Sequence, residues 1–211
     1  KYAISPNSYI YCDLLQPDYK QHCYKQQTQL RIKNWDNLLK NKNNNINSEY
    51  ILIPEQRRPE GITHTKNWLQ WANNTISILH THTNRPIVIR LHPNYPKQIP
   101  KLNHKNIIFT YKTPLHKDLK KAFACCTLSS KCDIESVIRG YHTFTFNTNS
   151  IVHDITNHNI SLINNPQIFD RQKWLNSISY SHWTLKEIAS GQYFTYFFNQ
   201  LLPYYNSLKD N

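Results

Sequence analysis

Cationic and hydroxyl side chains gather in four short segments of the sequence, each directly after a run of apolar residues. These segments are Glu55–Arg58, Arg90–Pro93, Tyr111–Pro114 and Thr127–Ser130. Their cationic members are Arg57, Arg58, Arg90, His92 and Lys112. The planar guanidinium of arginine can bind two phosphate oxygens at once, and lysine adds a point charge. The four segments together indicate a site for a phosphorylated ligand.

Ser129 and Ser130 stand where the sequence predicts the start of a helix, Lys131–Arg139. Their hydroxyls and the amides of the first helical turn would suit a phosphate, and the helix dipole would help. A simple N-cap is the commoner role of serine at such a position, so both interpretations stay open. The sequence has no Gly-x-Gly-x-x-Gly and no Walker motif. This argues against a dinucleotide oxidoreductase and a P-loop ATPase.

The elements that would position these segments alternate between strands and helices. Apolar runs predict five strands, at Tyr50–Pro54, Pro86–Leu91, Asn106–Thr110, Phe123–Leu128 and Thr143–Phe146. Helices are predicted between them, at 65–82, Pro114–Ala122 and Lys131–Arg139. Such alternation is typical of an α/β fold with a parallel sheet flanked by helices. Ligands of these sheets bind at the carboxyl ends of the strands, where all four segments fall.

Two regions flank this domain, which we expect at residues 49–169. Residues 1–48 predict an N-terminal arm or a minimal acceptor-side segment, with a short strand or extended arm near Ser8–Cys12 and helical spacing at 29–40. Residues 170–211 predict a helical, aromatic-rich tail that packs on the domain and is broken at Gly191. Core packing accounts for much of the aromatic content of this tail. Trp183 and Tyr193 are the two side chains that we expect to contact an acceptor.

The net charge is +12, with 25 Lys and Arg against 13 Asp and Glu. This excess favours an anionic partner such as a nucleotide, nucleic acid or acidic glycan. The compositional bias of an AT-rich genome, visible in the abundance of Asn, Lys and Ile, is the alternative explanation. The chain begins with Lys1 and contains no Met, so we expect it to start inside a longer reading frame.

Five cysteines, two of them adjacent at Cys125 and Cys126, fit neither a disulfide framework nor zinc-ligand spacing. We therefore expect buried thiols in a cytoplasmic protein that needs no metal. No apolar run is long enough for a transmembrane helix.

The order of these motifs resembles that of a glycosyltransferase family with the GT-B fold. Arg90–Pro93 with its His-Pro pair, Ser129-Ser130, Glu135 and Gly140 are similar to the signature of capsule polysaccharide enzymes of the Kdo-transferase and polysialyltransferase type. The stretch Ile51–Gln56 followed by Gly61 resembles the strand and loop that open the Rossmann-like, nucleotide-sugar-binding half of those enzymes. Asp170–Leu175 and Ser181–Gly191 resemble a segment of related viral and phage proteins. The resemblance covers roughly residues 50–191.

The resemblance implies a metal-independent transferase whose co-substrate is a nucleotide sugar. It implies that His92, Ser129 and Ser130 hold the donor phosphates, together with Arg57, Arg58 and Lys112. Glu135, with Thr113 and Gln56, would bind the donor ribose or base. Arg90 would neutralise the leaving nucleotide as the glycosidic bond breaks. Glu55 is the candidate general base, and a solvent-facing loop carboxylate is its alternative.

Three functions fit these observations. The first is transfer of a sugar to a glycan by a viral enzyme in the host cytoplasm, with another domain of the same polypeptide completing the acceptor side. The second keeps this chemistry but takes modified DNA as the acceptor, which the positive charge would suit. The third is a non-catalytic module that binds nucleotide sugars within a larger protein. Under the first we expect Arg90→Ala and His92→Ala to abolish donor binding and leave the fold intact.

Overall fold

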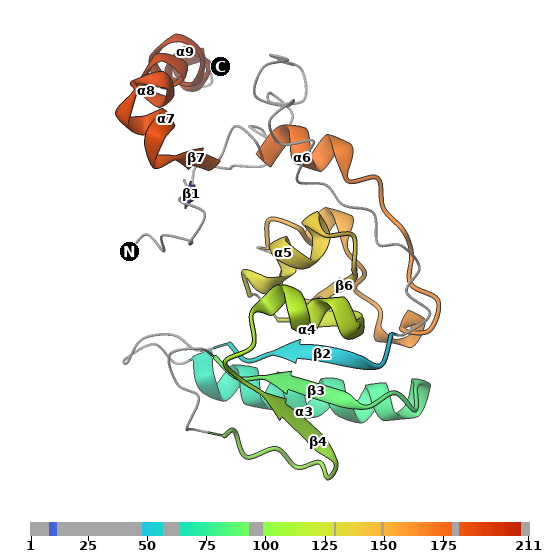
Figure 1. Cartoon of the computed structure of the whole chain (residues 1–211). Coiled ribbons are helices and arrows are strands. Elements are labelled where there is room, and N and C mark those ends of the chain that lie inside the picture. Colours follow the sequence, from blue (N-terminus) through green and yellow to red (C-terminus); the bar gives the residue numbers. More distant parts are fainter. Residues whose placement is uncertain are drawn as a thin grey trace. The chain divides into compact units, whose positions relative to one another are not determined.

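A computed structural model describes residues 9–11, 48–56, 64–92, 99–128, 130–148, 150–178 and 182–207. The chain divides into two compact units (Figure 1). One comprises Asn37–Arg171, and the other comprises Lys1–Asp36 together with Gln172–Asn211. In the described parts of the chain, no helix is both long enough and apolar enough to cross a membrane.

The first unit is built on a sheet of five parallel strands. These are β2 (Tyr50–Pro54), β3 (Ile87–Arg90), β4 (Ile107–Thr110), β5 (Ala122–Thr127) and β6 (His142–Thr145). Their order across the sheet is β4-β3-β2-β5-β6, and every neighbouring pair is parallel. The central strand β2 is buried along its whole length, as the apolar run Ile51–Ile53 requires of a strand covered on both faces.

Helices cover the two faces of this sheet (Figure 1). The long helix α3 (His64–His82) packs through Trp68, Ala72, Ile76 and Leu79 against Ile51 and its neighbours on one face. The short helix η2 (Ile160–Leu162) joins α3 on that face. On the other face, Leu119 of α4 (Leu115–Lys121) packs with Tyr50, Leu52 and Val88. The helix α5 (Cys132–Ile138) contacts α4, β5 and β6.

The five strands and three helices predicted for this unit are confirmed, with small shifts of boundary. The strand at Tyr50–Pro54 has the expected bounds, and the helix expected at 65–82 begins at His64. The strand expected at Phe123–Leu128 lies one residue earlier, at Ala122–Thr127. The α/β fold with a parallel sheet flanked by helices is therefore the observed architecture. The segment with helical spacing at 29–40 lies outside the described residues.

The second unit is rich in helix and aromatic side chains, as predicted for the tail. It contains α6 (Gln172–Ile178), α7 (Leu185–Ala189), α8 (Gln192–Tyr196), the π-helical η3 (Phe197–Leu201) and α9 (Leu202–Ser207). Gly191, at a φ of 81°, separates α7 from α8 in a left-handed conformation that suits glycine. A strand was not expected in the tail, yet β7 (His182–Thr184) pairs antiparallel with β1 (Tyr9–Tyr11).

Candidate functional site

The carboxyl edge of the parallel sheet contains a topological switch point. From β2 the chain adds β3 and β4 on one side, then crosses to add β5 and β6 on the other side. The connections leaving β2 and β5 therefore diverge, and ligands of doubly wound sheets bind in the crevice that forms there. Four groups of predicted site residues follow strands at this edge. They are Glu55 and Gln56 after β2, His92 after β3, Lys112 and Thr113 after β4, and Ser130 after β5.

Glu55 connects the ends of β2 and β3. Its Oε2 accepts a hydrogen bond from the main-chain N–H of His92 at 2.9 Å. The main-chain N–H of Glu55 donates to the carbonyl oxygen of Arg90 at 2.7 Å. Glu55 is only 5% exposed. The alternative of a solvent-facing loop carboxylate is therefore wrong, because Glu55 is part of the folded edge.

The guanidinium of Arg90 forms an ion pair with Asp118 on α4. The two side chains are 12% and 7% exposed, and Thr110 Oγ1 donates to the same carboxylate at 3.3 Å. Removing one member of a buried pair leaves an uncompensated charge, which costs about 3–5 kcal/mol. The expectation that the fold survives Arg90→Ala is therefore revised, because that change would leave Asp118 without its cation.

Asp118, the partner of Arg90, is a residue of this region that the sequence analysis did not select. A signal for it existed, since Leu115, Asp118, Leu119 and Ala122 follow the spacing of one helical face. An acid within an apolar helical face needs a cation on the element opposite. Tyr50 also belongs to this network, because its hydroxyl donates to the main-chain carbonyl oxygen of Asp118 at 2.8 Å. Burial, with further contributions from Asp118 and Glu49, raises the pKa of Tyr50 to about 12.

Lys112 lies in the loop between β4 and α4 with a φ of 64°. Residues with a Cβ rarely adopt this left-handed conformation, and a lysine there is unusual. Its side chain is exposed, and Nζ lies 5.5 Å from the ring centroid of Tyr111. Strained backbone of this kind is concentrated at functional sites. Among the exposed lysines that the structure describes, this conformation singles out Lys112.

Ser130 and Glu135 both make local contacts around α5. Ser130 Oγ accepts from the N–H of Cys132, the first residue of α5, at 3.3 Å. Glu135 Oε1 pairs with Arg139 Nη2 at 2.7 Å, four residues along the chain. Neither contact tests binding of a donor. Ser129, Arg57 and Arg58 lie outside the described residues.

Asp133, in the first turn of α5, is a buried acid that the sequence analysis did not select. It is 2% exposed, and it accepts hydrogen bonds from Ser150 Oγ at 2.8 Å and from Thr127 Oγ1 at 3.5 Å. Burial raises its pKa to about 6, although these hydroxyls act in the opposite direction. The spacing of Asp133, Ser136 and Val137 places the acid on the buried face of α5.

The cysteines of β5 are buried, as expected. Cys125 and Cys126 are fully inaccessible, and burial raises the pKa of both thiols. Among the residues that the structure describes, no cluster of three or more His, Cys, Asp or Glu side chains could hold a metal ion.

The two predicted acceptor contacts lie in the second unit, against each other. The rings of Trp183 and Tyr193 meet edge to face, with centroids 5.4 Å apart. Trp183 is 4% exposed. This burial favours the core-packing interpretation for Trp183, because a sugar ring could not stack on an inaccessible indole.

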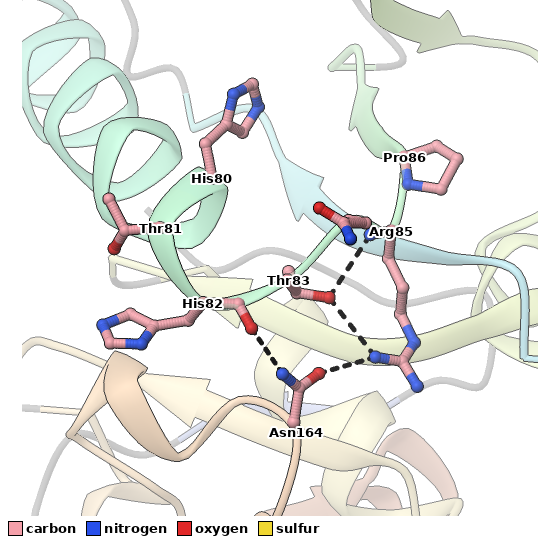
Figure 2. A pocket seen from close by; sticks show the side chains of 8 residues that line it. His80, Thr81, His82, Thr83, Arg85, Pro86 and Asn164 are labelled. Carbon is pink, nitrogen blue, oxygen red and sulfur yellow. Dashed lines mark hydrogen bonds between the residues drawn. The ribbon is translucent and has the colours of Figure 1, made fainter.

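A hollow of about 680 Å³ lies at the opposite, amino edge of the sheet, where β3 begins (Figure 2). Asn164 joins its two sides, since its Nδ2 donates to the carbonyl oxygen of His82 and its Oδ1 accepts from Arg85 Nη1 at 2.7 Å. Arg85 also lies 3.8 Å above the ring centroid of Phe123. In Figure 2 the ring of His80 points away from Arg85 and Asn164. The polar groups therefore secure the end of α3 and do not converge on one point.

No family model and no curated protein matches the sequence. Among solved structures, the chain is similar to Thermosulfurimonas dismutans KpsC, beta Kdo 2,4 transferase, with 11% identity and a TM-score of 0.42 over 82% of this chain and 62% of that chain. It is similar to the beta Kdo 2,7 transferase of the same organism's KpsC, with 13% identity and a TM-score of 0.42 over 78% and 53% of the two chains.

A third similar structure is Methanocaldococcus jannaschii UDP-GlcNAc 2-epimerase in complex with UDP-GlcNAc and UDP. It has 14% identity and a TM-score of 0.41 over 77% of this chain and 50% of that chain. The chain thus spans between half and about three-fifths of the length of the structures it matches. Likenesses of this low score and identity do not extend to function.

Proposed function

We propose that the chain is the donor-binding half of a nucleotide-sugar-dependent glycosyltransferase of the GT-B type. The observation that carries the proposal is the switch point at the carboxyl edge, with His92, Lys112 and Ser130 following three different strands there. A lysine, an imidazole and a hydroxyl at one sheet edge suit the oxygens of a diphosphate or monophosphate linkage.

In this proposal His92, Lys112 and Ser130 bind the donor phosphates, together with Ser129, Arg57 and Arg58. Gln56, Thr113 and Glu135 bind the ribose or the base. Arg90 contributes to donor binding in spite of its ion pair. Its guanidinium is bonded to Asp118 through Nη1. The remaining guanidinium N–H groups can meet charge that develops on the leaving nucleotide. Preorganised donors of this kind stabilise the transition state more than the ground state.

The acceptor in this proposal is a glycan, and a further domain of the polypeptide supplies the rest of its binding site. The net charge of +12 favours a second candidate, in which the acceptor is a modified base in DNA. Binding of duplex DNA that weakens steeply with salt would favour this candidate. A third candidate, a module that binds the donor without transferring the sugar, would bind nucleotide sugars and never release free nucleotide.

A thermal-shift screen tests the proposal against UDP, GDP, CMP, TDP and their sugars, with a DNA duplex in parallel. A ligand at 100 times its Kd stabilises the folded state by about 2.7 kcal/mol. For a chain of this size the melting temperature should rise by about 5–10 °C. His92→Ala should abolish the shift, while His80→Ala, at the opposite edge, should keep it. A parent protein that responds to none of the nucleotides would contradict the proposal.

A further inference from the structure

The hydrogen bond between Glu55 and His92 extends the pairing of β2 and β3 by one more bond, in which a side-chain oxygen is the acceptor. The register of the two strands sets Ile53 opposite Ile89 and Pro54 opposite Arg90. One step further, Glu55 lies opposite Leu91. The N–H of Glu55 still donates to the carbonyl oxygen of Arg90 at 2.7 Å, as a regular parallel ladder requires.

The next bond of the ladder comes from a side chain. In a regular parallel pair, the main-chain carbonyl of Glu55 would accept from the N–H of His92. The structure instead gives this N–H to the Oε2 of the Glu55 carboxylate, at 2.9 Å. A side chain reaches further than a carbonyl group, so the carboxylate can maintain the connection where the two strands begin to diverge.

Neighbouring contacts hold the residues before His92 from other directions. The N–H of Leu91 donates to the carbonyl oxygen of Thr110 in β4 at 2.8 Å. The side chain of Arg90 is held by Asp118 of α4. Glu55 adds a connection from β2 that reaches the main chain of His92 itself. The backbone from Arg90 to His92 is thus fixed by two strands and one helix.

We propose that Glu55 is a positioning residue for His92 and is not the general base of the reaction. Its carboxylate fixes the backbone of His92 at the carboxyl edge, so that the imidazole meets the donor phosphate in one orientation. The donor part of this inference rests on the proposed function, whereas the backbone part does not. A general base must approach the acceptor hydroxyl, and a carboxylate within a buried residue that already bonds a main-chain amide is poorly placed for that task.

Three substitutions of Glu55 separate charge, reach and hydrogen-bond acceptance. Glu55→Gln keeps an acceptor oxygen at the same reach and removes the charge. Glu55→Asp keeps the charge and shortens the side chain by one methylene. Glu55→Ala removes the acceptor. Glu49→Gln is the matched control, because Glu49 is an exposed residue before β2 whose side chain pairs with Lys121.

The first measurement is the hydrogen-exchange rate of the His92 main-chain amide. NMR monitors this rate in the protein without ligand. We expect Glu55→Gln and Glu49→Gln to leave the exchange rate within about threefold of the parent, and Glu55→Asp and Glu55→Ala to raise it at least tenfold. If Glu55→Ala does not fold, Glu55→Asp carries the test. Unchanged exchange in Glu55→Asp, or in a folded Glu55→Ala, would overturn the inference whether or not any nucleotide binds.

The second measurement is the Kd of each variant for the nucleotide found in the thermal-shift screen, and the rate of donor turnover. Positioning predicts that Glu55→Gln keeps both the Kd and the turnover rate close to those of the parent, while Glu55→Asp weakens binding about tenfold. Suppose that the Glu55→Gln variant binds the donor normally but turns it over at least a hundredfold more slowly. That result would contradict positioning and would assign Glu55 as the general base. If the parent protein binds no nucleotide, the proposed function is contradicted. The exchange result, which needs no ligand, remains valid as a test of the Glu55 contact.

Discussion

Arg90 at the end of β3 and Asp118 in the middle of α4 form an ion pair that is almost completely enclosed. The pair joins the carboxyl edge of the sheet to the helix that covers one of its faces. Thr110 Oγ1 donates to the same carboxylate, and the Tyr50 hydroxyl donates to the main chain at Asp118. A residue expected to act on a donor phosphate is therefore also a structural element of the fold.

This pair predicts an asymmetry between single and double substitutions. Arg90→Ala or Asp118→Ala should lower the free energy of unfolding by about 3–5 kcal/mol, because each leaves a buried charge without its partner. The double change Arg90→Ala with Asp118→Ala should cost less than the sum of the two single losses, because it leaves neither charge without its partner. Urea unfolding of the four proteins measures the coupling. Additive losses would show that the two side chains do not interact in solution.

Lys112 provides a separate test of strain at the proposed site. Lys112→Gly and Lys112→Ala remove the same ammonium group, but only glycine adopts the observed φ of 64° without strain. The glycine variant should be more stable than the alanine variant by about 1 kcal/mol. Both variants should bind the donor nucleotide more weakly than the parent. Equal stability of the two variants in urea unfolding would mean that the left-handed conformation is absent in solution.

Asp133 predicts a dependence of stability on pH. Its pKa is raised from 3.8 to about 6 by burial, so the native state holds a proton that the unfolded state releases between these values. The corresponding stability is fully present below pH 3.8 and is lost as the pH rises through about 6. A shift of roughly two pKa units corresponds to about 3 kcal/mol.

Asp133→Asn should remove this dependence, because the amide oxygen can still accept from Ser150 and carries no charge. Urea unfolding of parent and variant at a series of pH values between 4 and 7.5 gives the comparison. The variant should gain stability relative to the parent as the pH rises, and the gain should level off above pH 7. Parallel curves for the two proteins would refute a raised pKa at Asp133.

The strands and their carboxyl edge follow from local patterns in the sequence. Ile51–Ile53 is apolar at every position, which marks a strand covered on both faces, and its bounds are as predicted. The pairing of β7 with β1 could not be predicted, because its partner lies more than 170 residues away and neither segment has a distinctive pattern.

The site was predicted less completely than the fold. The sequence places Glu55 and Arg90 at strand ends, but it does not show that each is engaged with another element. In the Glu55 contact, a side-chain oxygen accepts a main-chain N–H just beyond the last paired residues of β2 and β3. The Asp118 contact depends on which residue of the sheet lies opposite the buried face of α4. Both depend on packing between elements, which periodicity along one element does not contain.

The most direct test of the account is to map nucleotide binding residue by residue, by following main-chain amide shifts in NMR during titration with UDP, GDP and CMP. A donor site at the carboxyl edge predicts saturable shifts at Gln56, His92, Lys112 and Ser130 for one nucleotide, with little change at Thr83 and Arg85 on the opposite edge. Shifts confined to the opposite edge, or none with any nucleotide, would contradict a donor site at the carboxyl edge of this sheet.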